Sequence, residues 1–310
     1  MTAKMTASSS KRAINGIFLL DKPQGITSNC ALQQVKRLFN AKKAGHTGSL
    51  DPLATGMLPI CFGEATKFSQ FLLDADKAYQ ATGLLGVKTT TADAMGDVIS
   101  QVDDFCVSQQ SLETALSHFT GNIKQVPSMF SALKHQGKPL YKLARAGIEI
   151  ERKAREIIIY NLRLEGFDGV SFDLNVLCSK GTYIRNLVED IGNELGLGAH
   201  VTRLHRQYTA GFDMEPMYSL QALTDMSPDE RLQCLLPEER AVHGYPIIIL
   251  KPEQIQKMHY GQTVMLDADE SSECSGLVRL RDINNVFIGL GDLNVTGELK
   301  VKRLVVMDPA

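Results

Sequence analysis

Apolar positions recur along this chain with two periods, about two residues and about 3.6 residues, which are typical of strands and helices respectively. The first pattern and short apolar runs predict strands over residues 16–20, 57–62, 79–87, 156–165, 170–177 and 200–206. The second predicts helices over residues 31–39, 64–73, 112–119 and 183–195, the first capped by Thr27 or Ser28. Because the elements follow no strict β–α–β order, the pattern favours an α+β fold over a doubly wound one.

A change of pattern near residues 235–246 indicates a domain boundary. Beyond it, short strand-like segments are separated by turn residues, at 247–250, 263–266, 276–280, 285–290 and 299–306. They predict a small all-β domain of about sixty residues, close to the lower size limit for independent stability. We therefore expect a main domain over residues 13–245 and a second domain over residues 246–310.

The N-terminus and the bulk composition exclude some classes of protein. Residues 1–12 are rich in Ser, Thr and Lys but lack the apolar stretch of a secretory signal, so we expect a disordered leader. The chain has 310 residues, of which 44% are hydrophobic and 22% charged, as is typical of a soluble globular protein. No apolar run is long enough to predict a membrane-spanning helix.

The cysteines argue against a metal centre. Six are scattered along the chain without a Cys-x-x-Cys pair: Cys30, Cys61, Cys106, Cys178, Cys234 and Cys274. This spacing is unlike that of zinc sites or of disulfide frameworks. We expect most of these thiols to be buried, in a protein of the reducing cytoplasm.

Positive charge is concentrated in one segment, although the net charge of the whole chain is −2. Residues 124–155 contain eight basic and two acidic residues, a balance of +6, which leaves −8 for the rest. Such a block is either a solvated charged face or a binding surface for a polyanion. Its weak periodicity and its prolines and glycines indicate an insertion that projects from the core.

Residues 45–59 contain three glycines, two prolines, one histidine and a single carboxylate, Asp51. Glycine and proline break helices and strands, so this segment is expected to be a loop whose backbone can approach a ligand. Pro52 restricts Asp51 to extended geometry and thereby fixes the direction of its side chain. The composition alone is equally typical of an ordinary surface turn.

The segment Gly45–Pro59 resembles the catalytic loop of the TruB family of tRNA pseudouridine synthases, whose single aspartate acts on the target uridine. Further segments resemble the same family in the same order: Leu20–Gly25, Gly63–Lys67, Ser131–Lys134 with Leu140 and Tyr141, and Ser179–Arg185. The resemblance runs from Ile14 to about Tyr208 and continues more loosely to the end. Ser49 departs from it, standing where alanine is common in the family.

The resemblance implies a fold and a partner. The catalytic domain would contain a mixed, largely antiparallel sheet with a thumb-like insertion over about residues 124–153, followed by a PUA-like RNA-binding domain. The substrate would be the T-loop uridine of tRNA, bound through the T-stem and T-loop and flipped out of the stack. The enzyme would be a cytoplasmic monomer that needs no metal, cofactor, guide RNA or protein complex, and a role in tRNA folding would be compatible with it.

The resemblance also assigns catalytic roles. Asp51 is the expected nucleophile, Arg185 the cation that pairs with it, and Tyr79 the aromatic ring that stacks on the target base and is a candidate acid–base group. A carboxylate in a closed pocket needs such a cation to stay ionised. From the residues alone, Arg185 is equally well a surface ion pair and Tyr79 an edge-strand aromatic.

Four further residues are expected to bind the substrate. His46 would take the place of the extruded base or brace it, Tyr183 and Leu204 would line the pocket, and Lys22 would help to hold the active-site loop. The alternatives are a loop histidine bonded to nearby backbone, two core side chains, and a turn lysine in solvent. RNA phosphates are expected to bind the basic block, at Lys134, Lys138, Lys142, Arg145 and Arg152.

Three other functions remain open at this point. The first is a non-catalytic RNA-folding factor that uses the same surfaces. The second is a glycoside hydrolase or nucleosidase built on Asp51, although such enzymes usually need two carboxylates. The third is a guide-RNA-dependent synthase that works within a protein complex, which the basic insertion disfavours.

Overall fold

The computed structural model describes residues 10–267 and 274–306 of the chain. The first nine residues of the expected leader therefore lie outside the described residues. The remainder of that segment differs from the expectation, because the backbone N–H of Arg12 donates to the carbonyl of Asn40 and Arg12 pairs with Ala41. The folded body thus begins before residue 13.

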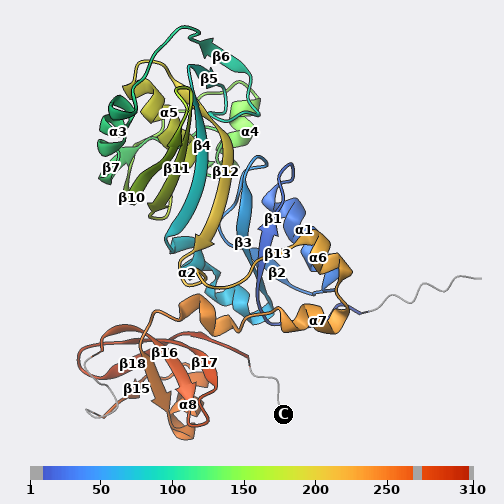
Figure 1. The fold of residues 1–310 in the computed structure, drawn as a ribbon. Helices are drawn as coiled ribbons and strands as arrows, with labels where there is room; N and C mark the ends of the chain where they lie inside the picture. Colours follow the sequence, from blue (N-terminus) through green and yellow to red (C-terminus); the bar gives the residue numbers. More distant parts are fainter. Residues whose placement is uncertain (1–9, 268–273, 307–310) are drawn as a thin grey trace, which may run out of the picture.

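A nine-stranded sheet forms the centre of the catalytic domain, with its long strands side by side in Figure 1. Along the sheet the strands follow the order β13–β1–β3–β12–β4–β11–β10–β7, and β2 pairs with β3. The strands are β1 (Gly16–Lys22), β2 (Ala44–His46), β3 (Thr55–Phe62), β4 (Lys77–Leu85), β7 (Gly121–Gln125), β10 (Arg155–Phe167), β11 (Ser171–Cys178), β12 (Ala199–Thr209) and β13 (Tyr218–Ser219). Only β1–β13 and β3–β12 are parallel pairs, so the sheet is mixed and largely antiparallel, as expected.

Helices cover the sheet and close the core. They are α1 (Ser28–Leu38), α2 (Ser69–Asp74), α3 (Gln109–Ser117), α4 (Leu140–Arg145), α5 (Ile184–Glu194), α6 (Leu220–Asp225) and α7 (Pro228–Gln233), with the 3₁₀ helices η1 (Gly63–Phe68) and η2 (Glu238–Val242). The hydroxyl of Thr27 caps α1 by accepting the N–H of Cys30. The helix expected over residues 64–73 is instead η1 followed by α2. The short helices α6 and α7 were not predicted, because each spans too few residues for a periodic apolar face.

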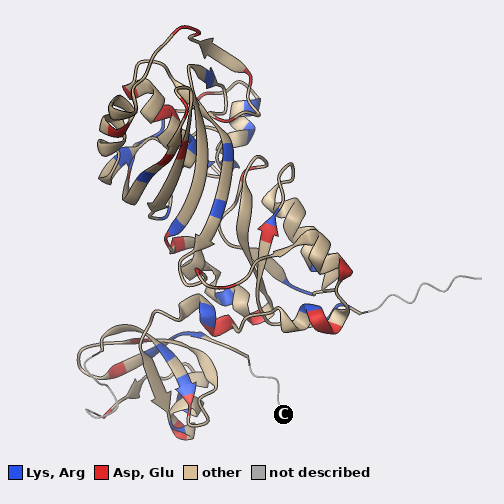
Figure 2. Ribbon diagram, viewed as in Figure 1, with Lys and Arg blue, Asp and Glu red and all other residues tan. Residues whose placement is uncertain are grey.

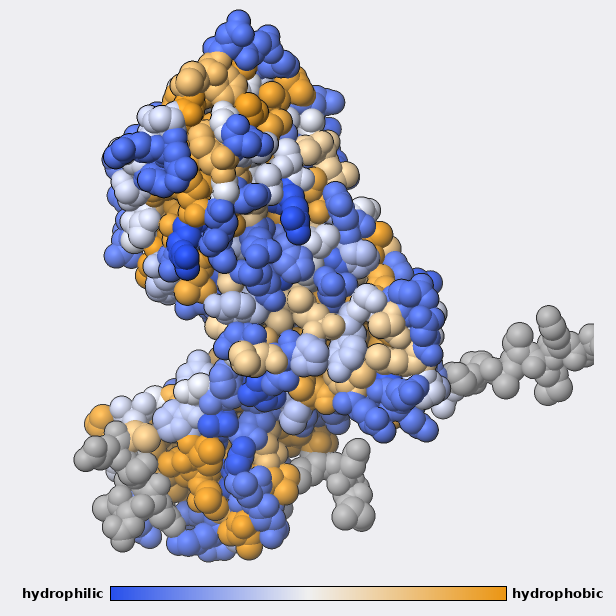
Figure 3. Space-filling view, viewed as in Figure 1, coloured by the Kyte–Doolittle hydropathy of each residue, from blue (hydrophilic) through white to orange (hydrophobic). Residues whose placement is uncertain are grey.

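Residues 126–154 connect β7 to β10 and contain most of the basic block, whereas Lys124 lies in β7 and Arg155 begins β10. This connection contains the two-residue strands β8 (Lys134–His135) and β9 (Lys138–Pro139) and the helix α4. A second hairpin, β5 (Val87–Thr89) with β6 (Val98–Gln101), lies at the same end of the molecule (Figure 1). Figure 2 shows lysine and arginine on α4, and hydrophilic side chains gather over the middle of the catalytic domain in Figure 3.

The C-terminal domain is a five-stranded sheet in the order β14–β16–β17–β18–β15. Its strands are β14 (Ile247–Leu250), β15 (Val264–Met265), β16 (Gly276–Asp282), β17 (Phe287–Leu293) and β18 (Glu298–Leu304), which match the five expected segments. The helix α8 (Pro252–His259) was not predicted.

The small domain is docked on the catalytic domain by polar and apolar contacts. Glu239 of η2 forms ion pairs with Arg279 and Arg281 at 2.9 and 2.8 Å. The rings of Phe68 and Phe287 pack 5.5 Å apart within a core cluster that both domains share. This shared core adds to the small hydrophobic core of the domain, which its size makes marginal by itself.

The cysteine expectation was wrong for most of the six thiols. Only Cys61 and Cys178 are buried, and burial raises the pKa of each to about 12. Cys30 and Cys106 are exposed, and the other two are partly exposed. No helix in the described part of the chain is long and apolar enough to cross a membrane.

Candidate active site

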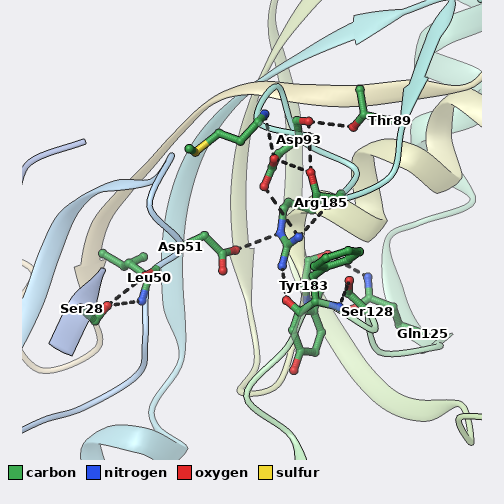
Figure 4. A network of polar contacts seen from close by, with 12 residues as sticks. Ser28, Leu50, Asp51, Thr89, Asp93, Gln125, Ser128, Tyr183 and Arg185 are labelled. Carbon is green, nitrogen blue, oxygen red and sulfur yellow. Dashed lines mark hydrogen bonds and ion pairs between the residues drawn. The ribbon is translucent and has the colours of Figure 1, made fainter. Parts of the chain in front are cut away.

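The residues on both sides of Asp51 are tied to the start of helix α1. The hydroxyl of Ser28 accepts the N–H of Leu50 at 2.7 Å and donates to the carbonyl of the same residue at 2.9 Å, as Figure 4 shows. On the other side, the carbonyl of Pro52 accepts the N–H of Gly25 at 2.8 Å. These bonds hold the loop backbone in place on both sides of Asp51. They therefore fix the direction of its carboxylate, which would vary if the loop were mobile.

Lys22 supports this arrangement from inside the protein. Its ammonium group donates to the carbonyls of Pro23 and Ile26, both at 2.8 Å, and the residue is fully buried. Desolvation lowers its pKa to about 8, opposed by the Asp51 carboxylate and assisted by the charge of Arg206. The alternative of a solvent-exposed turn lysine is therefore wrong. Its bonds hold the turn at residues 23–26, which contacts the loop through Gly25 and Pro52, and the residue offers no exposed surface for substrate contact.

Because Lys22 is buried, the free energy of unfolding is expected to change with pH in the alkaline range. Its pKa is about 8 in the folded protein and 10.5 when unperturbed. Between these values the unfolded chain binds more protons, so this lysine makes the free energy of unfolding rise with pH. Wild type should therefore gain stability relative to Lys22→Met between pH 8 and 10.5, with a constant difference below pH 8. Urea titrations across this range measure it, and a difference independent of pH would contradict the buried state.

Asp51 and Arg185 form the ion pair that the sequence predicts. The Nε atom of Arg185, in the first turn of α5, lies 2.9 Å from Oδ2 of Asp51. The Arg185 side chain is only 4% exposed, and its other nitrogens donate to the carbonyls of Thr91 at 2.6 Å and Phe130 at 2.8 Å. The alternative of a surface ion pair is thus wrong, because this buried guanidinium joins the loop of Asp51, the connection between β5 and β6, and the insertion (Figure 4).

A second carboxylate, not predicted from the sequence, faces the same guanidinium. Oδ2 of Asp93 lies 3.7 Å from Nη1 of Arg185, and Oδ1 accepts bonds from the hydroxyl of Thr91 and the N–H of Met95. Asp93 is buried, whereas the side chain of Asp51 is 41% exposed. Of the two carboxylates at this arginine, only Asp51 is therefore accessible to a substrate.

The pKa of Asp51 is raised above its ordinary value by partial removal of water around the carboxyl group. Arg185 opposes this rise through its charge and its hydrogen bond, and Asp93 adds to it by repulsion. The guanidinium is therefore the main group that favours the ionised form of Asp51. This is the form that a nucleophilic or proton-abstracting role requires.

Tyr79 and Leu204 lie in neighbouring strands under the loop. Tyr79 of β4 is opposite Arg206 of β12 in the strand register, and Leu204 is two residues earlier on β12. Both side chains belong to the core cluster that also contains Leu50 of the loop. Tyr79 is only 8% exposed, and burial raises the pKa of its phenol. In the free protein, both side chains are therefore largely covered.

Tyr183 is held at the N-terminus of α5 by a buried glutamine. The side-chain oxygen of Gln125 accepts the N–H of Tyr183 at 2.8 Å, and its amide donates to the carbonyl of the same residue at 3.0 Å. The Tyr183 side chain is partly exposed, close to Arg185 in Figure 4. Gln125 was not predicted as a site residue, because a strand-end glutamine has no distinctive sequence signal.

His46 ends strand β2 and enters the loop with an unused polar atom. Among the described residues, its buried Nδ1 has no hydrogen-bond partner, so the alternative of a histidine bonded to nearby backbone is not supported at this atom. Desolvation and the nearby charge of Arg206 lower the pKa of the imidazole. The ring is therefore mostly neutral near pH 7, and its unpaired Nδ1 is enclosed in the free protein.

The basic insertion presents four of its five expected RNA-binding residues to solvent: Lys134, Lys138, Lys142 and Arg145. Arg152 differs, because its guanidinium donates to the carbonyls of Pro127 and Ile150 at 3.1 and 3.2 Å and is half-buried. Arg152 thus ties together the two chain segments at the base of the insertion. Within the described part of the chain, no cluster of His, Cys, Asp or Glu is suited to hold a metal ion.

Comparisons with known proteins agree with this architecture. Residues 36–184 match the TruB family pseudouridylate synthase N-terminal domain, residues 185–243 the tRNA pseudouridylate synthase B C-terminal domain, and residues 246–305 the C-terminal domain of pseudouridine synthase II TruB. The tRNA pseudouridine synthase B of Legionella pneumophila (strain Lens) is 55% identical, over 97% of this chain and 99% of its own length. Its counterpart in Pasteurella multocida (strain Pm70) is 51% identical, over 95% and 96% respectively.

Solved structures show the same fold. A chain of a Cbf5–Nop10–Gar1 complex matches with a TM-score of 0.72 and 26% identity, covering 94% of this chain and 85% of that one. A chain of an archaeal box H/ACA Nop10–Cbf5 complex matches with a TM-score of 0.70 and 24% identity, covering 94% and 86%, and supports the fold alone. From its sequence matches along nearly the whole length, this chain belongs to the TruB family of pseudouridine synthases.

Proposed function

We propose that this protein converts the T-loop uridine of tRNA, position 55, into pseudouridine. The observation that carries the proposal is the Asp51–Arg185 pair, in which a buried cation holds a solvent-accessible carboxylate on a fixed loop. The reaction breaks the N1–C1′ bond and forms a C5–C1′ bond. The C5 proton is lost to solvent, and N1 gains a proton.

Asp51 is proposed to act on the ribose. Attack on the sugar carbon and removal of a sugar proton both require the ionised carboxylate, and Arg185 supplies the charge that favours it. Asp93 is buried and serves to hold Arg185 in place. The arrangement therefore supports one reacting carboxylate rather than the pair that a typical glycoside hydrolase uses.

The target base is proposed to enter a pocket that the free protein keeps nearly closed. Extrusion of a base costs a few kcal/mol, which stacking and hydrogen bonds in the pocket offset. Tyr79 provides the stacking surface, and the unpaired Nδ1 of His46 provides a polar contact near the vacated position in the RNA. Leu204 and the partly exposed Tyr183 form walls of this pocket.

The exposed insertion is proposed to bind the phosphates of the T-stem. Replacing Lys134, Lys138 and Lys142 together with alanine should weaken tRNA binding and reduce its salt dependence. The slope of log K against log salt is expected to fall by about one for each lysine that no longer binds a phosphate. Filter binding between about 50 and 200 mM salt measures this slope. The matched control replaces the same lysines with arginine, and an equal weakening there would argue against a role of charge.

The first experiment is tritium release from an unmodified tRNA transcript labelled at C5 of uridine, with the purified protein alone. Release should equal one equivalent per tRNA and should disappear when the T-loop uridine is replaced by cytidine. Release without added guide RNA or protein would agree with a stand-alone cytoplasmic enzyme, and the molar mass from light scattering would test the expected monomer. Free uracil as product would instead favour a nucleosidase, and tight binding without release would favour an RNA-folding factor.

A further inference from the structure

Arg206 of β12 is a buried arginine that spans the active-site loop and the sheet. Its side chain is fully enclosed, with 1% of the residue exposed. Nε donates to the carbonyl of Met57 at 2.6 Å, and Nη2 donates to the carbonyl of Gly48 at 2.9 Å. Gly48 lies three residues before Asp51, so this one side chain links strand β3 to the loop that carries the carboxylate.

The charge of Arg206 is not neutralised by an acid. Among the residues that the structure describes, no carboxylate lies within ion-pair distance of its guanidinium, and its charge lowers the pKa of Lys22, His46 and Lys77. Burial of an unpaired charge is unfavourable, and here two backbone carbonyls compensate for it. The buried guanidinium is therefore stable only where it can donate hydrogen bonds to both carbonyls.

Two of the glycines in the loop segment lie against residue 206. Gly48 has φ +73°, and a Cβ atom there would lie 3.2 Å from Nη1 of Arg206. Gly56 has φ +96°, and a Cβ atom there would overlap the backbone oxygen of residue 206 at 2.2 Å. The glycine at position 48 is therefore partly explained by the Arg206 side chain, whereas Gly56 permits the close approach of the β12 backbone.

Arg206 also lies beside the aromatic residue of the site. It is opposite Tyr79 in the register of β12 and β4, and its charge lowers the pKa of the phenol against the larger effect of burial. Because Arg206 holds the loop at Gly48 and stands on the strand next to Tyr79, the separation between the carboxylate and the stacking ring depends on the bond to Gly48.

We propose that Arg206 is a positioning residue, which fixes the Asp51 loop relative to strand β3 and the neighbouring Tyr79 through its bonds to Gly48 and Met57. The proposal rests on the proposed function, because it assigns Arg206 a role in the same reaction. A catalytic group displaced by about 1 Å reduces the rate about 10²-fold. Because Arg206 is almost fully buried, it contributes no surface for RNA binding.

The test compares Arg206→Lys with wild type in single-turnover tritium release and in tRNA binding. Lysine keeps the positive charge, but its single nitrogen cannot reproduce the two differently directed bonds of the guanidinium. We expect the rate constant to fall about 10²-fold while the Kd for tRNA stays within about twofold. The matched control is Arg203→Lys, an exposed arginine on the same strand. A rate near that of wild type, or a fall in rate explained by weaker binding, would overturn the proposal.

A second variant keeps the test decisive if Arg206→Lys does not fold. Gly48→Ala leaves Arg206 in place but moves a methyl group against Nη1, and it should also lower the rate with binding retained. Its control is Gly196→Ala, where φ is +75° against +73° at Gly48 and no neighbour lies within 4 Å of the added carbon. Equal rates in these two variants would remove Arg206 from the positioning of the loop. Absence of release by wild type would instead reject the proposed function itself.

Discussion

Replacing Asp51 with asparagine is expected to abolish tritium release, with a fall in single-turnover rate of about 10⁴-fold or more. Asparagine has nearly the same shape but carries no negative charge, so it cannot attack the sugar or remove a proton from it. The loop should keep its structure, because Ser28 and Gly25 bind backbone groups of its neighbours and not the Asp51 side chain. Binding of tRNA should therefore remain within a few-fold of wild type.

A matched substitution separates loss of the reacting carboxylate from loss of charge near Arg185. Asp93→Asn removes the buried carboxylate on the other side of the same guanidinium and leaves Asp51 in place. It should retain measurable release, at a rate well above that of Asp51→Asn. Release by Asp51→Asn at the wild-type rate would show that the assignment of Asp51 is wrong. If Asp51→Asn binds tRNA but releases no tritium, the result agrees with a synthase that has lost its reacting carboxylate.

Replacing Arg185 with methionine is expected to have the second largest effect, about 10²- to 10³-fold in rate. The substitution leaves Asp51 and Asp93 without their shared cation and leaves the carbonyls of Thr91 and Phe130 unpaired. Breaking such a buried pair by removing one partner costs about 3–5 kcal/mol of stability. Single-turnover release and urea unfolding measure the two consequences on the same preparation.

The pH dependence of Arg185→Met provides an independent check. Because Arg185 lowers the pKa of Asp51 in wild type, its removal should raise that pKa further. The ionised fraction of Asp51 then falls at a higher pH, and the acid limb of the rate profile should shift to higher pH in the variant. Arg163→Met, at an exposed arginine on β10, is the control for loss of one positive charge. An unshifted acid limb would indicate that Arg185 does not control the ionisation of the reacting group.

Local patterns allowed much of the sheet to be predicted. The paired strands β10 and β11 were expected because Phe172, Leu174 and Val176 alternate with polar residues, and this alternation is a property of neighbouring residues. Helix α5 was expected for the same reason, from its apolar face. Elements too short to show a period, such as α6 and α7, could not be found in this way. The apolar spacing over residues 64–73 does not distinguish 3₁₀ from α geometry. It therefore predicts one continuous helix where the structure has two.

The docking of the C-terminal domain on the rest of the protein could not be predicted from the sequence either. The strands β14 to β18 follow from local alternation and turn residues, but the ion pairs of Glu239 join residues about forty positions apart. An acidic residue in a polar segment gives no indication of which arginine it will meet. The exposed positions of the insertion were predicted from its charge, whereas the structural role of Arg152 depends on where Pro127 and Ile150 lie.

By itself, the sequence determined the order and type of the longer elements and the resemblance to the family, because these are encoded in local patterns and recognisable motifs; the pairing of Asp51 with Arg185 was implied by that resemblance alone. Only the tertiary structure decided that Asp93 shares this arginine, that Lys22 is buried, and that Arg206 binds the loop. The hydrogen-bond partners of Arg206 are backbone carbonyls. Every residue has a backbone carbonyl, so residue identity does not indicate which ones Arg206 will bind. Their selection depends on distances across the sheet, and these exist only once the chain has folded.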